Sequence, residues 1–596
     1  MKEREALYSE KIKTYQSEIS LLQKRLTLIA FFRMIIFVML CVCVYFYIRD
    51  RDTKTLLYAA ISLFVLFVLV IRINFTVRDK KLLTDRILFI NTNELGLING
   101  NRNEFDNGEL LAAPEKYYSD LDIFDENSIF HLLNRTTTSH GQEYLANFLK
   151  HPLQTKQDID QYQESVKILS GEFEKRQLLI AQGLLHIEKE GTLHSVSDWL
   201  NTPNELHKKR WPTILRWVLP ILNLIALYYF FANNTGYYYL PILITGACSW
   251  LVLAYFNKYI SSQHLLISKK EQVLDQYKSI LEVFNTVDAK SSIVLKNLHA
   301  ASVDAVHAIH RLARLSQAFD QRLNLVISLF GNTIFLYDIH AMVLLEKWKA
   351  ANKNHFPQWI DCVGNIEYIN SLACFAFNNP NHVYPSVHIG KSTIEARKVA
   401  HPLIADEKRV ANDFILGENE KIQLITGSNM SGKTTFLRTI GVNLLLAQCG
   451  APVCATSFSF SPMKLLSSIR ISDSLQENTS YFMAELKRLQ QIITELKTNE
   501  PALVLIDEIL RGTNSEDKTH GSEQFIRKLL QYQCVCLFAT HDLTLGKLED
   551  EMPMLVSNYC FESTIQDNEL YFDYTLQKGI AKNKNASFLM EKMDII

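Results

Sequence analysis

The feature that most constrains the fold is a short apolar run that leads directly into a glycine-rich loop and then into a helix-like segment. Residues 421–435 read Lys-Ile-Gln-Leu-Ile-Thr-Gly-Ser-Asn-Met-Ser-Gly-Lys-Thr-Thr, and an apolar run with helical spacing begins at Phe436. The loop fits the pattern G-x-x-x-x-G-K-[ST]. Its glycines allow backbone N–H groups to surround a phosphate at a helix N-terminus. This order of elements predicts a phosphate-binding loop in an α/β domain.

The residue types in the loop indicate separate roles. Lys433 is expected to reach the β- and γ-phosphates of a nucleotide, and the Thr434 hydroxyl is expected to hold Mg²⁺. The residues expected to bind the nucleotide here are Gly427, Ser428, Asn429, Met430, Ser431, Gly432, Lys433, Thr434 and Thr435. A chance match in a turn rich in Gly, Ser and Lys is the alternative. The flanking apolar run and helix make it the weaker interpretation.

Two further apolar runs end in polar residues that suit the same site. One run ends in Asp507-Glu508, and the other ends in Thr540-His541. Buried parallel strands bring such residues together at their carboxyl ends, where ligands of α/β sheets bind. We expect Asp507 to orient Mg²⁺, Glu508 to polarise an attacking water and His541 to sense the γ-phosphate. Each run alone could be an ordinary buried strand, but all three in this order predict an Mg²⁺-dependent ATPase with catalytic Glu508, His541 and Lys433.

Composition limits the other classes of function. The 596 residues are enough for several domains, and a net charge of −1 gives no overall positive field that would indicate nucleic-acid binding. The ten cysteines are scattered, without any C-x-x-C pair. This usage predicts buried free thiols in a reducing compartment and no structural metal site.

Four apolar runs occur as two pairs, each joined by a short polar turn. They are residues 34–48 with 56–71, and residues 217–232 with 237–256. Buried core helices are the alternative, but these runs are longer than most core segments and lack polar periodicity. They predict two membrane hairpins, with four helices in contact with the lipid bilayer.

The hairpins also predict an orientation. An ATP site has to face the cytoplasm, so both hairpins would cross the membrane and return. Basic residues cluster on the flanks expected to be inside, although the outer turn at 49–55 is also basic. The predicted location is the cell (inner) membrane, multi-pass, with the ATPase domain in the cytoplasm.

The remaining sequence is helical up to the α/β region. Residues 257–350 have the pattern of long amphipathic helices, and residues 76–116 suggest a connector with short strands. The predicted segments are a charged N-terminal helix (1–27), membrane hairpin 1 (28–75), a connector (76–116), a helical core (117–213), membrane hairpin 2 (214–256), lever-like helices (257–389) and the ATPase domain (390–596).

Several separate motifs resemble those of the MutS family of mismatch-repair ATPases. The loop 427–435 resembles G-P-N-M-x-G-K-S-T, with Ser428 in place of proline, and residues 507–514 resemble D-E-I-G-R-G-T-S. Ala539-Thr-His541 resembles the family's A-T-H, and residues 480–485 resemble its S-T-F-M-x-E element. The resemblance covers about residues 390–580 closely and the helical core more weakly.

The apolar runs and the resemblance together predict a multidomain fold: two transmembrane helical hairpins from the apolar runs, and, as the resemblance implies, an all-α core and lever region and a C-terminal α/β P-loop ATPase domain of the ABC and MutS type. The resemblance implies ATP and Mg²⁺ as cofactors and Val410 beside the adenine. It also implies a homodimer through the ATPase domains, in which Ser480 reaches the partner's nucleotide in trans. The sequence departs from the family before the core, because residues 1–116 leave no room for the mismatch-recognition and connector domains.

Two functions remain open. The first is a membrane-anchored ATPase that binds mismatched or branched DNA through its core and lever region, as family membership implies. The alternative is an ATP-driven conformational module that acts on a membrane or envelope protein without binding DNA. A transporter is disfavoured because the sequence lacks an L-S-G-G-Q signature and the hairpins offer no charged substrate path.

Overall fold

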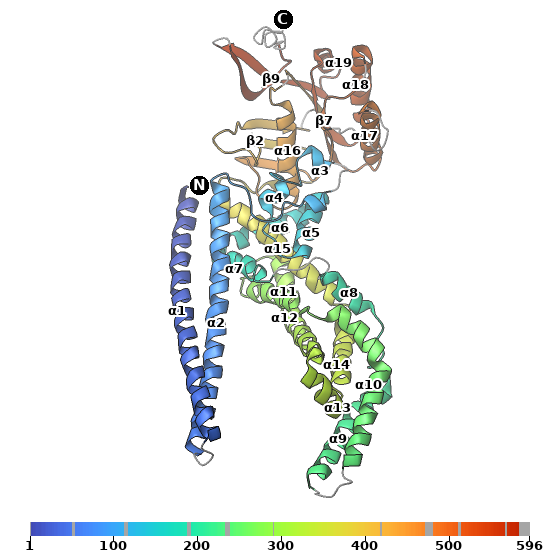
Figure 1. Ribbon diagram of the computed structural model, residues 1–596. Helices are drawn as coiled ribbons and strands as arrows, with labels where there is room; N and C mark the ends of the chain where they lie inside the picture. Colours follow the sequence, from blue (N-terminus) through green and yellow to red (C-terminus); the bar gives the residue numbers. More distant parts are fainter. Residues whose placement is uncertain are drawn as a thin grey trace.

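The computed structural model describes residues 2–49, 54–112, 117–186, 192–232, 239–289, 291–417, 420–428, 430–470, 481–510, 514–566 and 569–582. The molecule is elongated, with a mixed α/β domain at one end and the tips of two helical hairpins at the other (Figure 1). A body of helices joins the two ends. The described part of the chain therefore separates the predicted nucleotide site from the predicted membrane segments by the length of the helical region.

The first hairpin consists of helices α1 (Lys2–Arg49) and α2 (Lys54–Ile98), which pack along each other (Figure 1). α2 continues to Ile98 through the segment in which the sequence suggested short strands, so that expectation is wrong for residues 76–98. A strand would need alternating polarity. The sequence here instead buries Ile90 and Glu94, four residues apart on one helical face, against the core.

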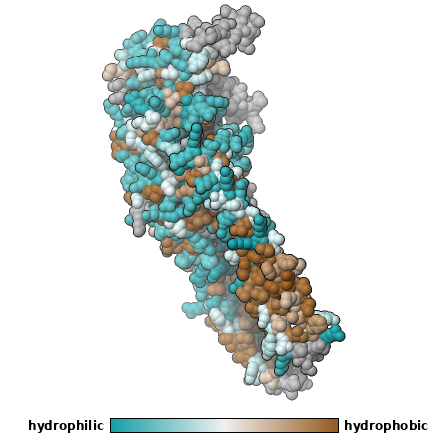
Figure 2. Space-filling model, turned by 90° about the vertical axis from the view of Figure 1, so that its left-hand side faces the viewer, coloured by the Kyte–Doolittle hydropathy of each residue, from teal (hydrophilic) through white to brown (hydrophobic). Residues whose placement is uncertain are grey.

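The second hairpin consists of α9 (Arg210–Ala232) and α10 (Tyr239–Ile267). Among the described residues, α1, α2, α9 and α10 are the four single helices that are long and apolar enough to cross a membrane. Many of their large apolar side chains are exposed. Figure 2 shows apolar surface gathered at the end of the molecule opposite the α/β domain.

A helical core lies between the hairpins and the α/β domain. Its elements before the second hairpin are α3 (Tyr117–Asp120), α4 (Ile129–Leu133), α5 (Ser139–Lys150), α6 (Lys156–Gly171), α7 (Phe173–Gly183) and α8 (Thr192–Asn201). Those after it are α11 (Glu271–Phe284), α12 (Ile293–Asp320), α14 (Tyr337–Asn352) and α15 (Phe356–Asn378). The Thr138 hydroxyl accepts from Gly141 N at 2.9 Å, so it caps α5.

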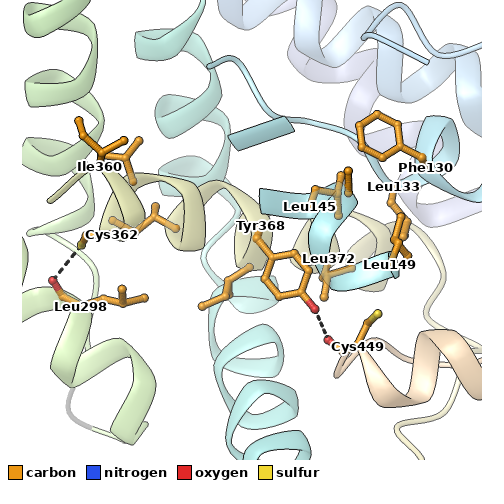
Figure 3. Close-up of a cluster of buried hydrophobic side chains, with 14 of the residues drawn as sticks. Phe130, Leu133, Leu145, Leu149, Leu298, Ile360, Cys362, Tyr368, Leu372 and Cys449 are labelled. Carbon is orange, nitrogen blue, oxygen red and sulfur yellow. Dashed lines mark hydrogen bonds between the residues drawn. The ribbon is translucent and has the colours of Figure 1, made fainter. Parts of the chain in front are cut away.

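Helix α15 is the centre of this core. Nearly all of its side chains are buried, and it packs on α5, α6 and α12. Figure 3 shows Tyr368 of α15 donating to the carbonyl of Cys449, at 2.6 Å, and Cys362 donating to the carbonyl of Leu298. Cys449 follows the helix α16 (Lys433–Gln448) of the α/β domain, so α15 contacts that domain directly.

One helical prediction is wrong in detail. The sequence suggested long helices throughout residues 257–350, but α12 and α14 are separated by irregular turns. These are η2 (Gln321–Leu323), the π-helical turn η3 (Ile327–Gly331) and the short helix α13 (Asn332–Phe335). Leu336, between α13 and α14, has a φ of 50° and interrupts the helix.

The C-terminal domain contains two sheets. The larger has the strand order β10-β9-β4-β8-β7-β6, in which all neighbours are parallel except β9 and β10. Its strands are β4 (Ile422–Gly427), β6 (Lys464–Ser468), β7 (Ala502–Asp507), β8 (Cys534–Thr540), β9 (Val556–Gln566) and β10 (Glu569–Lys578). The smaller sheet, in the order β1-β5-β2-β3, comprises β1 (Ser386–Val387), β5 (Ser457–Phe460), β2 (Ile394–Val399) and β3 (Asn412–Leu416).

The three apolar runs of the sequence become adjacent central strands. β4, β8 and β7 are buried along their whole length, as the uninterrupted apolar runs predict for parallel strands covered on both faces. The helices described around the larger sheet are α16, α17 (Tyr481–Leu496), α18 (Ser515–Leu529) and α19 (Lys547–Glu551). The predicted mixed α/β domain is therefore confirmed.

Candidate nucleotide site

The loop between β4 and α16 has a backbone that requires its glycines. Gly432 has a φ of 101°, and Met430 also lies in the left-handed region at 68°. A Cβ atom at Gly427 would stand 2.7 Å from Ser431 Oγ and 2.9 Å from the Phe561 carbonyl oxygen. A side chain at this position would collide with both, so the residue that ends β4 has to be glycine.

Lys433 lies at the first position of α16 with its ammonium held over this loop. The side chain is buried, and Nζ donates to the carbonyls of Gly427 at 2.9 Å and Ser428 at 2.8 Å. These contacts fix the long side chain inside the loop rather than in solvent. Gly427 and Ser428 therefore act on the site through their carbonyl groups as well as through the turn.

Thr434 and Asp507 meet as the sequence predicted. Parallel pairing of β4 with β8, and of β8 with β7, brings the carboxyl end of β7 beside the loop. Thr434 Oγ1 donates to Asp507 Oδ2 at 2.5 Å. A hydroxyl and a carboxylate side by side form an all-oxygen donor set, which suits Mg²⁺.

Glu508 stands on a strained backbone next to these groups. Its φ is 56°, and its N–H donates to the Ala539 carbonyl at 3.0 Å. The left-handed conformation is costly for a residue with a side chain and is typical of functional sites. It turns the Glu508 carboxylate toward His541, whose Nε2 lies 3.7 Å from Glu508 Oε2.

His541 follows β8 and contacts the loop from the other side. Its Nδ1 lies 2.7 Å from the Gly427 carbonyl oxygen, which can only accept, so Nδ1 carries the hydrogen. Burial lowers the pKa of His541, and so does the Lys433 ammonium 3.5 Å from Nδ1. The imidazole is therefore neutral at pH 7, with Nε2 facing Glu508.

These groups line one cavity of about 560 Å³. The residues predicted for the site that line it are Val410, Met430, Ser431, Gly432, Lys433, Thr434, Thr435, Asp507, Glu508 and His541. Gly427 and Ser428 lie behind Lys433, as described above. Asn429 and Ser480 fall outside the described residues, so their predicted roles stay predictions.

Three side chains of the site carried no predicted role. Lys518 of α18 forms an ion pair with Glu508, and Glu485 of α17 accepts from the Leu510 N–H at 2.8 Å. The ring of Tyr574 lies against the loop, because a Cβ at Gly432 would be 3.0 Å from Tyr574 Cδ1. Glu485 belongs to the motif at residues 480–485. Nothing in the spacing of Lys518 or Tyr574 marked them.

The helical core also contacts the nucleotide site. Asp122 pairs with Arg438 of α16 and with Arg470 after β6, both at 2.7 Å. The buried Asp120 accepts from Ser467 Oγ at 2.5 Å and from Arg470 N at 2.8 Å. The core therefore holds both the helix that follows the loop and the strand that precedes residues 471–480.

Comparison with known proteins agrees with this geometry. Residues 423–591 match the family model for MutS domain V. The chain is 34% identical over 203 residues to MutS protein homolog 4 of Mus musculus, a match that covers 32% of this chain and 21% of that protein. It is 32% identical over 220 residues to the DNA mismatch repair protein MutS of Finegoldia magna, covering 36% and 25% of the two chains.

The MutS of Bacillus subtilis is 28% identical over 245 residues, covering 40% of this chain and 28% of that one. The matched segment thus spans between a fifth and a third of these relatives. The family-model match lies in the C-terminal domain, which is therefore similar to MutS domain V.

Proposed function

We propose, from a C-terminal domain of the MutS domain V type, that this chain is a membrane-anchored ATPase whose nucleotide cycle moves its core and lever helices. One observation carries the proposal: the Thr434–Asp507 contact lies in a single cavity with Lys433 and Glu508. Phosphate-binding lysine, magnesium ligands and a candidate base are thereby within reach of one bound nucleotide.

Each residue has a distinct part in hydrolysis. Lys433, released from the carbonyls of Gly427 and Ser428, binds the β- and γ-phosphates, and Thr434 with Asp507 would hold Mg²⁺. The ion, when bound, neutralises charge on the transferred phosphoryl group. Glu508 orients and polarises the attacking water, and neutral His541 positions its Nε2 toward the same space. Tyr574 and Val410 flank the part of the cavity where the adenine of the nucleotide would lie.

A homodimer completes this proposal. Ser480 is the residue that the resemblance places on the partner's nucleotide, and α17, which starts at Tyr481, is tied to the site through Glu485 and Leu510. Mixing Ser480→Ala chains with Lys433→Ala chains tests the composite site. Mixed dimers should recover part of the wild-type ATP turnover, because one of their two sites is intact. Turnover equal to the sum of the two separate variants would contradict it.

Membrane anchoring through four helices, in the cell (inner) membrane with the ATPase domain in the cytoplasm, is the second part of the proposal. It is supported by the exposed apolar lengths of α1, α2, α9 and α10. Full-length protein should stay with membranes through an alkaline wash, and its ATPase domain should be digested by protease only from the cytoplasmic side. Release of the protein by the wash would contradict the membrane anchoring and leave the ATPase proposal intact.

DNA binding by the core and lever region is a second candidate, supported by the similarity to DNA mismatch repair proteins. In this chain the lever helices run toward the second hairpin (Figure 1). This direction favours a partner molecule in or near the membrane. Binding of homoduplex, mismatched and branched DNA by the detergent-solubilised chain, measured at two salt concentrations, distinguishes DNA binding from action on a membrane partner. Affinity that falls steeply with salt would support DNA binding. Weak binding without salt dependence would favour a membrane or envelope partner.

A further inference from the structure

We propose that residues 321–336, here named the lever tip, enter the hydrocarbon of the same bilayer as α9 and α10 as a re-entrant element. The inference rests on the proposed membrane anchoring and extends it to the moving end of the lever. The lever tip joins α12 to α14, the two helices that run from the core toward the second hairpin (Figure 1). The partner of this surface is lipid.

The surface of the lever tip is apolar and open. Six of its large side chains are between 48% and 81% exposed: Leu323, Leu325, Val326, Leu329, Phe330 and Phe335. No Asp, Glu, Lys, Arg or His stands between Arg322 and Asp338 in the sequence. A contiguous group of exposed large apolar side chains without a charge is costly in water and favourable in hydrocarbon.

Two carbonyls at the break in the lever tip are satisfied from within the protein. The segment Ile327–Phe335, made of η3 and α13, meets α14 at 80°, and Thr333 and Ile334 lie directly before this break. The buried Asn223 of α9 donates its Nδ2 to their carbonyls, at 2.9 and 3.1 Å. Broken helices occur at membrane depth only where other protein groups replace the missing hydrogen bonds. An amide inside an apolar helix provides that replacement here.

Further contacts join the lever tip to α10. Trp250 Nε1 donates to Thr333 Oγ1 at 3.0 Å. A Cβ at Gly246 would lie 3.3 Å from Thr333 Cγ2, so the small residue allows a close approach of the two elements. The lever tip and the second hairpin therefore present one continuous apolar surface, and the hairpin cannot be in lipid while the lever tip stays far from it.

Charged residues mark where the lever tip leaves the apolar region. Arg322 pairs with Asp338 at 3.1 Å, and His264, near the end of α10, lies 2.9 Å from Asp320. These pairs stand at the two ends of the lever tip and beside the hairpin. Charges confined to one level, with an uncharged segment beyond them, are the arrangement expected at the edge of a membrane.

The consequence concerns the output of the ATPase. If the lever tip is in lipid, nucleotide-driven movement of α12 and α14 displaces it within the membrane. A segment that re-enters the bilayer can change lipid packing or the contacts of a neighbouring membrane helix. This names lipid as the direct partner of the moving end.

Spin-label accessibility in phospholipid nanodiscs tests the inference with the full-length chain. Exposed Cys41 and Cys248, with the half-buried Cys43, are first replaced by serine, because the other seven cysteines are buried. A nitroxide is then placed at Leu329→Cys in the lever tip. The matched references are Val65→Cys on α2 and Val303→Cys on α12, 52% and 42% exposed, the latter about 25 Å from the start of the lever tip.

The lever-tip label should be relaxed strongly by oxygen and weakly by a water-soluble nickel chelate, as at Val65. The label at Val303 should show the reverse. Binding of a fluorescent ATP analogue by each variant reports that the chain is folded, since all three positions are remote from Lys433.

Three outcomes overturn the inference in distinguishable ways. Strong relaxation of the Leu329 label by nickel, with Val65 still protected, removes the lever tip from lipid and leaves the anchor intact. Protection of the Leu329 label from both reagents means that protein covers it, such as a second copy of the chain. Nickel access at Val65 as well would remove the membrane anchor itself.

Discussion

The phosphate-binding loop and the lever tip both interrupt regular secondary structure, and they differ in the kind of polar group that surrounds the interruption. Gly432 in the loop and Leu336 at the lever tip both have positive φ, at 101° and 50°. Around the loop the chain gathers charged groups, including Lys433 and Asp507. Around the lever tip it supplies the neutral amide of Asn223 and keeps charges at the ends.

The proposed placement of the lever tip in lipid accounts for this difference. A charged ligand such as a phosphate is bound by ionised groups in a polar cavity. Opposite charges and remaining water there compensate the cost of desolvation. Hydrocarbon offers no such compensation, so a polar side chain at the lever tip has to be neutral and fully hydrogen-bonded. The comparison supports the proposal that the two ends of this chain face different solvents, and the following predictions test each end.

Loss of the Glu508 carboxylate should have the largest effect. Glu508→Gln keeps the shape of the side chain but removes the base that polarises water, so ATP turnover should fall about 10²- to 10⁴-fold while ATP binding remains. Phosphate release and nucleotide affinity are the measurements. The control is Glu523→Gln on α18, where the carboxylate pairs with Arg527 outside the site. Turnover near wild type in Glu508→Gln would contradict the assigned role.

Acid should destabilise the nucleotide end through His401. Burial, with Arg438 and Arg409 nearby, lowers the pKa of His401 to about 4. The unfolded chain, with a histidine pKa of about 6.5, takes up the proton first as the pH falls. The stability due to neutral His401 is therefore complete above pH 6.5, and about 3 kcal/mol of it is lost as the pH falls to about 4.

Calorimetry of the solubilised chain between pH 7.5 and pH 4.5 measures this effect. The transition of the nucleotide end is identified by its shift with an ATP analogue and magnesium. His401→Asn should flatten its dependence on pH. The transition of the membrane end, which contains His264 and has its own dependence on pH, should be the same in His401→Asn as in the wild-type chain. A change in that transition would weaken the comparison.

Removal of the Asn223 amide should loosen the lever tip. Asn223→Leu leaves two carbonyls without a donor, at a cost of about 2 kcal/mol. Unfolding by sodium dodecyl sulfate in mixed micelles is the measurement. Thr245→Val is the control, since Thr245 donates to Pro241 within its own helix at 3.0 Å. Equal effects of the two substitutions would mean that the bridge from α9 to the lever tip contributes nothing specific.

The smallest effect is expected where the first hairpin joins the core. Tyr8 is buried and donates to Asn378 Oδ1 at 2.8 Å, at the end of α15. Tyr8→Phe should cost about 1 kcal/mol and increase hydrogen exchange in the first turns of α1. Tyr15→Phe, on the same helix and only half-buried, should change exchange little. Unchanged exchange in Tyr8→Phe would show that the hydroxyl does not hold α1 to the core.

The sequence by itself determined the elements that depend on local pattern. Glycines at 427 and 432, the following Lys433 and the apolar runs before Asp507 and His541 predicted the loop, three central strands and the residues at their ends. Uninterrupted apolar length likewise predicted the four long helices. These features are readable because helical and strand periodicity, and the chemistry of a phosphate-binding turn, involve residues that are close in the chain.

Only the tertiary structure decided the contacts between distant residues. Lys518 reaches Glu508 and Tyr574 covers Gly432 because β7, α18 and β10 converge on one edge of the sheet. Leu336 breaks a segment that reads as helix, since Asn223, more than a hundred residues earlier, supplies the hydrogen bonds that the break requires. A local pattern cannot encode a partner from another element. The sequence therefore predicted the nucleotide site, and the fold revealed where the lever ends.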